Sequence, residues 1–321
     1  MVIGRTAVVS LKALSVGPAA SLALSTPGAA LRLHSLFPSA LNLEVEGSRV
    51  LVALTGPSGV SYPHAVALDH PVLFPSLCFE PGDPGLLYAD SIRLQGRSTS
   101  LAVALGQARR PAARVLPAIT TPGGAWQASA DRLECFQSRF SCALRLKALF
   151  DAAESMTPVG TALRRSALAL GAAAHAVTRP TAALRHAVSC LVGMGPGLTP
   201  SGDDFLCGFI AASQASGSPA LVSALGQAVE LSLAATGEIS ASLLRCALAG
   251  QWPQPLADLA DALAAESCRD ALNALDMLCG LGHSSGADIA TGFLFGVTAL
   301  VACRAARRGG VPGERPLTAR P

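Results

Sequence analysis

A short glycine-rich pattern occurs twice in the chain and contains the residues best suited to chemistry. Ser201–Phe209 and Ser285–Phe293 share the spacing S-G-x-D-x-x-x-G-F, and a G-x-G sequence precedes each copy, at Gly193 and at Gly280. Glycine allows a ligand to approach the backbone closely, and the first N–H groups of a helix bind anions. The duplication therefore predicts two related helix N-termini that share one pocket.

The turns and the helix starts supply the binding groups expected for a carboxylate or a phosphate. Backbone N–H groups and the hydroxyls of serine and threonine donate hydrogen bonds to such anions. The predicted substrate-binding residues are Gly195, Gly197, Thr199, Ser201, Gly202, Ser285 and Gly286. No lysine of the P-loop kind follows the glycines, so a nucleoside triphosphate is not the expected ligand.

Part of each copy has a purely structural explanation. A serine at a helix N-cap and an acid three residues later form a capping box, in which the acid reaches back to the first N–H groups. We therefore predict that Asp204 caps its helix together with Ser201, and that Asp288 caps its helix together with Ser285. Both acids are assigned a structural role.

Two residues depart from the repeat and are the candidates for catalysis. Asp203 occupies the position of Ala287 in the other copy, so capping does not require its carboxylate. His283 occupies the position of Thr199, directly before the second helix start. Asp203 would act as a base or bind an amide or ammonium group, and His283 would donate a proton or contact an anion. The alternatives are a solvated acid at a helix start and a histidine that supports the cap.

The other histidines and cysteines show no spacing typical of metal ligands or of a nucleophile. Neither an H-E-x-x-H nor a G-x-S-x-G motif occurs, and no cofactor and no metal are expected. Glu238 and Ser240 follow Thr236-Gly237 at another turn into a helix. They would either cap that helix or line the same cleft.

Helices must position these residues, and the sequence predicts an α+β fold with the helices in its second part. We expect a β-rich N-terminal domain over residues 1–125 and a compact α-helical domain over residues 126–321 that carries the glycine-rich motifs. Strands are predicted at 31–35, 41–45, 49–54, 91–95 and 98–104. Helices are predicted at 133–153, 158–176, 180–191, 201–215, 219–235, 239–249, 255–265, 267–279 and 285–306. Gly208 and Gly292 weaken two of these helices about two turns from their starts, which predicts that two backbones approach closely there.

Composition argues against several classes of partner. The net charge is only +3, and no dense basic stripe with interleaved aromatic residues is present, so nucleic acid is not an expected partner. The longest apolar run, Ile289–Cys303, is short for a membrane span, and no membrane partner is expected. The nine cysteines are odd in number and include no C-x-x-C pair, which favours buried free thiols and a cytoplasmic location.

Two of these runs resemble the signatures of a known family. Gly193–Asp204 and Gly282–Gly286 look like the signatures of the AllH family, whose members are subunits of oxamate carbamoyltransferase. The resemblance extends to Thr236–Gly250 and, more weakly, to His34–Leu43. It covers most of the chain from about residue 30 to about residue 305, and the glycine-rich run is its most specific part.

The resemblance implies a reaction and partners that could not be inferred from the residues alone. The family's reaction moves a carbamoyl group between oxalurate and phosphate, giving oxamate and carbamoyl phosphate in allantoin and purine breakdown. It implies a small carbamoyl or carboxylate substrate, phosphate, and other subunits of the complex, one of them similar to acyl-CoA synthetase chains. Carbamoyl transfer needs an anion pocket and donors for the developing oxyanion, which two helix N-termini with glycine turns would supply.

Two functions remain open at this level. The chain is either a carbamoyltransferase subunit that does chemistry, or a binding or assembly subunit whose partner does it. Asp203 and His283 within hydrogen-bond reach of each other across an open cleft would favour the first function. Side chains that point apart would favour the second.

Overall fold

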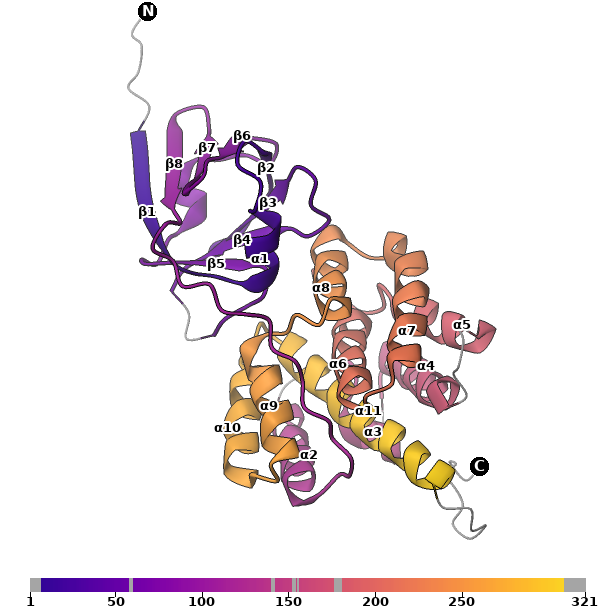
Figure 1. Cartoon of the computed structure of the whole chain (residues 1–321). Coiled ribbons are helices and arrows are strands. Elements are labelled where there is room, and N and C mark those ends of the chain that lie inside the picture. Colours follow the sequence, from indigo (N-terminus) through magenta and orange to yellow (C-terminus); the bar gives the residue numbers. More distant parts are fainter. Residues whose placement is uncertain are drawn as a thin grey trace, which may run out of the picture. The chain divides into compact units, whose positions relative to one another are not determined.

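The protein consists of two compact units (Figure 1). The computed structural model describes residues 7–57, 60–139, 142–151, 154, 156–175 and 181–308, with the backbone alone for Ala7, His175 and 301–308. The first unit runs to Arg114 and includes Ala249–Gln254, and the second comprises the rest from Val115 onward. The N-terminal β-rich part and the C-terminal helical part confirm the predicted α+β class. The boundary predicted at residue 125 falls inside the first helix of the second unit.

The first unit is a closed barrel of eight strands with a short helix and a 3-10 turn. Around the barrel the strands follow the order β1-β5-β4-β3-β2-β6-β7-β8, with parallel pairing in β1–β8 and β4–β5 and antiparallel pairing elsewhere. The elements are β1 Ala7–Val16, α1 Pro18–Ala23, β2 Ala30–Leu36, β3 Ala40–Val45, β4 Val52–Thr55, β5 Ala65–Leu68, η1 Phe74–Leu77, β6 Pro84–Leu87, β7 Ser91–Gln95 and β8 Thr99–Ala104.

Alternating apolar residues fill the barrel interior. Leu31 and Leu33 of β2 are buried between exposed neighbours, as the period of two in that strand predicts. The strands predicted from sequence correspond to β2, β3, β4, β7 and β8. The prediction missed β1, and it missed the four-residue strands β5 and β6 because these two short runs lie among prolines that normally mark loops.

The second unit is helical. Its elements are α2 Gly124–Gln137, α3 Leu146–Phe150, α4 Pro158–His175, α5 Ala182–Leu191, α6 Ser201–Ala215, α7 Pro219–Ser232, η2 Leu233–Ala235, α8 Glu238–Leu248, α9 Gln254–Ala264, α10 Cys268–Cys279 and α11 Ser285–Arg308. From α4 onward the helices agree with the sequence prediction to within a few residues. The ends predicted at residues 176 and 180 lie outside the described residues.

The single helix predicted over residues 133–153 is wrong. The structure has α2 and α3 instead, with α2 ending at Gln137. The Gln137 amide donates to the Leu144 carbonyl oxygen at 3.2 Å and accepts from the Leu146 N–H at 2.9 Å. This buried side chain binds the backbone of the turn that follows, which replaces the helical hydrogen bonds that would otherwise continue α2.

The helices α6 and α11 form the centre of the second unit and lie side by side (Figure 1). After Asp204, α6 carries no charged residue, and nearly all of its side chains are buried, as expected for a helix that is apolar all round. A Cβ atom on Gly208 would overlap the Ile289 carbonyl oxygen, and one on Gly292 would overlap that of Phe205. The predicted close approach of two backbones is confirmed.

Membrane spans and disulfides can be assessed for the described part of the chain. None of its helices combines the length and the apolar character that a membrane span requires. Its eight cysteines are free, but only Cys207, Cys246 and Cys279 are buried, so the expectation of buried thiols is wrong for most of them. The Cys303 side chain lies outside the described residues.

Replacing Gly208 with alanine should destabilise the protein by about 1–3 kcal/mol, the usual cost of forcing extra volume into a packed core. Its methyl group would overlap the backbone of α11 at Ile289. Gly226→Ala in α7 is the matched control, because its Cβ would lie 3.7 Å from Leu248 Cδ2, an ordinary contact. Alanine there should be neutral or stabilising by up to about 1 kcal/mol. Urea unfolding of both variants measures the difference, and equal stabilities would contradict the contact.

Candidate functional site

The turn before α6 is held in shape by glycines in the left-handed region. Residues 192–200 join α5 to α6, whereas only residues 280–284 join α10 to α11. Gly193, Gly195 and Gly197 have φ of 76°, 126° and 96°. A side chain at Gly193 would also overlap the Ala235 carbonyl oxygen, whereas a Cβ on Gly197 would meet open space. The first turn is therefore the longer of the two. Gly197 within it is not packed against neighbouring atoms.

The two serines do not act as N-caps, which corrects the capping prediction. Ser201 is the first residue of α6, its N-cap is Pro200, and no side chain caps this end. The Asp203 and Asp204 N–H groups bind the Pro200 carbonyl oxygen instead, at 2.9 and 3.1 Å. Ser285 is likewise the first residue of α11, and the Asp288 N–H binds the Ser284 carbonyl oxygen at 2.9 Å. Backbone carbonyls satisfy these N–H groups, so the hydroxyls of Ser201 and Ser285 are not needed to cap them.

Asp203 ties the glycine turn to the start of α8. It is 1% exposed, and its carboxylate accepts hydrogen bonds from the Gly193 N–H at 2.8 Å, from Thr236 Oγ1 at 2.5 Å and from Ser240 Oγ at 2.7 Å. A buried carboxylate with three donors is already satisfied. Ser240 therefore joins the first motif as a structural partner, while Glu238 at the start of α8 is exposed.

The N-termini of α6 and α11 meet, as the repeat predicts. Thr199 Oγ1 and Ser285 Oγ form a hydrogen bond of 2.7 Å. The Asp204 carboxyl faces these two hydroxyls, one from each turn. The arrangement is reciprocal, because Asp288 in the other helix faces Ser284 of the second turn and Ser201 at the start of α6.

Asp204 and Asp288 form a buried pair of acids, called the carboxyl pair below. Their exposed fractions are 2% and 1%. Burial, together with the charge of Asp288, raises the pKa of Asp204 well above its ordinary value. Burial raises the pKa of Asp288 to about 7, and the nearby hydroxyls of Ser201 and Ser284 oppose this rise. One oxygen of Asp204 and both oxygens of Asp288 nevertheless lack a hydrogen-bond partner.

The geometry favours the opposite division of roles from the one predicted. Asp203 was expected to do chemistry and Asp204 and Asp288 to be structural, yet Asp203 is the acid whose oxygens are bound. The carboxyl pair retains unpartnered oxygens below the turns. Identical acids at matching positions of the repeat were the signal in the sequence that a pair would form.

Gly202 and Gly286 are packing residues and not donors to a ligand. The Gly202 N–H binds the Met194 carbonyl oxygen at 2.8 Å, and the Gly286 N–H binds that of Leu281 at 3.1 Å. Both glycines are buried, and a Cβ on either would overlap the end of the preceding helix, at the Leu191 or the Leu278 carbonyl oxygen. Their N–H groups are unavailable for the substrate-binding role predicted for them.

The other predicted binding residues surround the meeting point of the two helices. Gly195, Thr199 and Ser285 are half-buried, Gly197 is exposed, and Ser201 is buried beside the carboxyl pair. His283 is exposed in the second turn and forms no hydrogen bond with Asp203. The structure thus brings together the hydroxyls, the turns and the carboxyl pair, but not the two predicted catalytic residues.

Sequence reasoning missed two residues that contact these acids. Thr236 binds Asp203, and Ser284 faces Asp288. Thr236 lies far from the motif in sequence. The only signal for it was its place in the T-G-E-I-S run, Thr236–Ser240, at the start of α8. Ser284 occupies the position of Pro200 in the other copy, so the repeat gave no signal for it.

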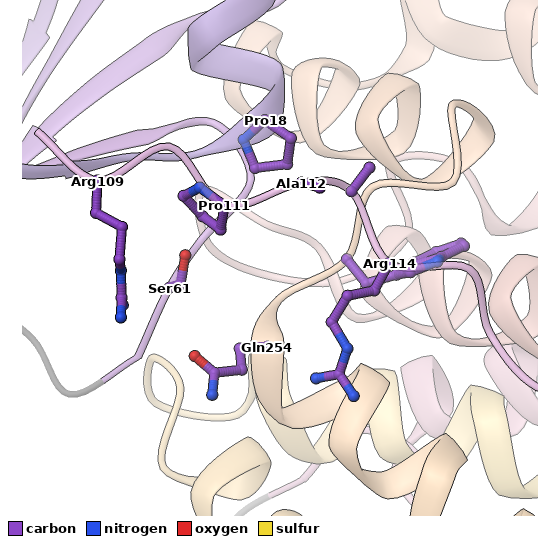
Figure 2. A pocket seen from close by; sticks show the side chains of 9 residues that line it. Pro18, Ser61, Arg109, Pro111, Ala112, Arg114 and Gln254 are labelled. Atoms are coloured by element: carbon purple, nitrogen blue, oxygen red, sulfur yellow. The ribbon is translucent and has the colours of Figure 1, made fainter.

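The first unit has a separate pocket of about 340 Å³ (Figure 2). Its lining includes Arg109, Arg114, Ser61 and Gln254. Figure 2 shows the two arginine side chains on either side of Gln254. None of the residues predicted from the repeat lines this pocket.

The motif region matches a known family. The family model described as oxamate carbamoyltransferase subunit AllH matches residues 191–297, about a third of the chain. The match begins at the end of α5, includes both copies of the repeat, and ends within α11. The resemblance seen in the sequence is confirmed over this region. No solved structure matches the chain.

Asp203→Asn should lower the free energy of unfolding by about 1–3 kcal/mol, the range for leaving buried hydrogen-bonding groups unpaired. The amide nitrogen cannot accept the hydrogen bonds that Thr236 and Ser240 donate. Asp131→Asn is the control, because Asp131 is an exposed acid on α2 whose carboxylate accepts a hydrogen bond from Gln127. The control should stay within about 0.5 kcal/mol of wild type. A variant at Asp203 as stable as the control would show that these hydrogen bonds do not hold the turn.

In metal-free buffer the stability of the protein should fall as the pH rises from 5 to 7. The folded-state pKa of Asp288 is about 7, against 3.8 when the group is exposed, so the folded protein binds a proton that the unfolded chain has released. One such proton makes the free energy of unfolding fall by up to about 1.4 kcal/mol per pH unit in this window, and the slope decreases as the pH passes the folded-state pKa.

The variant Asp288→Asn isolates this effect. It cannot titrate, so its stability relative to wild type should increase between pH 5 and 7. Urea unfolding at several pH values measures the difference between the two proteins, in which the titrating groups that do not interact with Asp288 cancel. Parallel pH curves would contradict the raised pKa.

Proposed function

We propose that this chain is a subunit of an oxamate carbamoyltransferase-type enzyme complex. The observation that carries the proposal is the family match at residues 191–297, which coincides with the two turns and the meeting helix N-termini. Sequence similarity and local geometry therefore point to the same region of the chain.

The proposed reaction is the transfer of a carbamoyl group between oxalurate and phosphate, in allantoin and purine catabolism. A phosphate oxygen bonds to the carbamoyl carbon, the bond from that carbon to the oxamate nitrogen breaks, and a proton passes from phosphate to that nitrogen. The products are carbamoyl phosphate and oxamate, and the reverse reaction uses the same groups. Such a transfer needs the two anions held close together and donors for the oxyanion that develops on the carbamoyl group.

The outer side of the turns is the proposed substrate site. Gly195 and Gly197 offer backbone that a ligand can approach, and Thr199 and Ser285 offer hydroxyls at the two helix N-termini. These groups would bind phosphate or the substrate carboxylate. His283, exposed beside Ser285, would contact the anion or exchange the proton. Asp203 would position the turn through its bond to Gly193 and would not itself take a proton.

The proposal includes partners. A subunit acts with other chains, and we infer that one of them is similar to acyl-CoA synthetase chains, as the family resemblance implies. The eight cysteines whose side chains the structure describes are free, which supports a reducing, cytoplasmic setting for such a complex.

A non-catalytic binding or assembly subunit is the second candidate. The observation that favours it is the separation of the two predicted catalytic residues. Asp203 is buried and fully bonded, whereas His283 is exposed and makes no contact with it. In this case the turns would bind substrate or a partner chain, and the partner would supply the groups that move protons.

The test is an assay of oxalurate phosphorolysis with the purified chain, alone and with its candidate partner subunits. We expect turnover only with the partners present. In the reconstituted complex, His283→Asn and Thr199→Val should each lower kcat/KM by about tenfold or more, equivalent to about 1.4 kcal/mol of transition-state stabilisation.

The matched control is His186→Asn, since His186 is an exposed histidine of the same unit outside the repeat. Its activity should equal that of wild type. Full turnover by the single chain would contradict the need for partners. Wild-type activity of both His283→Asn and Thr199→Val in the complex would favour the binding subunit.

A further inference from the structure

The carboxyl pair lacks a counter-charge. Asp204 and Asp288 form no ion pair within the described residues, and no cationic side chain is among the main groups that act on either of them. The charged groups near Asp204 are Asp288 and Asp203, both acids. Two buried carboxylates without a positive partner are strongly unfavourable, so either a proton or a cation must compensate them.

Oxygen atoms surround the pair. Thr199 and Ser285 face Asp204, while Ser201 and Ser284 face Asp288. Four hydroxyls and two carboxyls make a set of hard oxygen donors that come from both turns and both helix starts. Hydroxyl, carboxylate and water oxygens are the ligands that Mg²⁺ and Mn²⁺ prefer.

Unpartnered atoms distinguish this cluster from an ordinary acidic patch. One oxygen of Asp204 and both oxygens of Asp288 are buried without a hydrogen bond of normal geometry, although the hydroxyls of Ser201 and Ser284 lie close enough to Asp288 to lower its pKa. Asp203 lies next to Asp204 in the same helix turn, yet its carboxylate is satisfied by three donors. The protein therefore supplies donors where an acid is structural, and leaves coordination sites free at the carboxyl pair.

The helix N-termini oppose a cation, and their effect must be weighed. Each helix end contributes about half a positive charge, whereas the ionised pair contributes two negative charges. The first N–H groups of α6 and α11 are also bound to the carbonyl oxygens of Met194, Pro200, Leu281 and Ser284. The carboxyl pair therefore dominates the local field.

We propose that Asp204 and Asp288 bind one divalent cation of the Mg²⁺ or Mn²⁺ class between the starts of α6 and α11, with hydroxyls and water completing its coordination. The cation lies beneath Thr199 and Ser285, which are half-buried, and attracts an anionic ligand to the turns above it. This attraction rests on the proposed substrate site, but the binding of the cation does not.

Electron paramagnetic resonance with Mn²⁺ tests the site on the full chain at pH 7.5, without substrate or partner. The six-line signal of hydrated Mn²⁺ should decrease with a stoichiometry of one ion per chain, and added Mg²⁺ should restore it. Asp204→Asn and Asp288→Asn should each weaken the affinity at least tenfold. The control Asp276→Asn, an exposed acid paired with Arg132 in the same unit, should leave it unchanged.

Two results would overturn the proposal. One is a wild-type chain that leaves the Mn²⁺ signal unchanged up to millimolar concentration. A shared proton would then be the only counter-ion of the carboxyl pair. This result does not require any variant to fold. The other is equal binding by wild type and by the Asp204→Asn/Asp288→Asn double variant.

Ser284→Ala provides a further check, since this half-buried residue can be shortened without disturbing the core, and its loss should weaken binding severalfold. Neither outcome depends on carbamoyl transfer, so failure of the transferase assay leaves this test intact.

Discussion

Direct contact between the backbones of α6 and α11 is the constraint on which the rest of the second unit depends. Gly208 lies against Ile289 and Gly292 lies against Phe205, at equivalent positions of the two copies. Side chains at either glycine would separate the helices. Because the contact is about two turns from each helix start, it also brings the two N-termini together, where Thr199 meets Ser285. Packing in the core thereby creates the chemical site at its edge.

The two copies are nearly symmetric around this contact, and function is expected where the symmetry ends. Each copy places an acid opposite a hydroxyl of the other copy, Asp204 toward Ser285 and Asp288 toward Ser201. Only the first copy has the longer turn with three left-handed glycines, and only the first has Asp203, which fastens that turn to α8. The outer surface of this turn is the asymmetric part of the arrangement.

Burial gives the carboxyl pair properties that neither acid would have alone. An exposed aspartate is ionised at neutral pH, whereas the pKa of Asp288 is raised to about 7 and that of Asp204 well above its ordinary value. The cost of keeping unpartnered acids in a core is large enough that a structural role alone does not explain them, since two apolar residues would pack there at less cost. Such pairs are typical of functional sites.

Local residue patterns were enough to predict most of the helices, the duplicated motif and the place where two backbones meet. Helix starts and stops are local, so glycine and proline signals located α4 to α11 closely, and Gly208 and Gly292 indicated the contact. The family resemblance was likewise readable from contiguous residues of the motif. Short strands such as β5 and the break after α2 could not be predicted in this way. A short strand depends on its pairing partner, and the break after α2 depends on hydrogen bonds from the Gln137 side chain to residues several positions away.

Only the tertiary structure decided what each acid does. Asp203, Asp204 and Asp288 look alike in the sequence, and capping geometry suggested that the last two were structural. Whether a buried acid is satisfied depends on donors that arrive from other elements, such as Thr236 and Ser240 of the α8 turn for Asp203. The same holds for the carboxyl pair, whose members come from helices far apart in the chain and whose environment exists only when those helices pack.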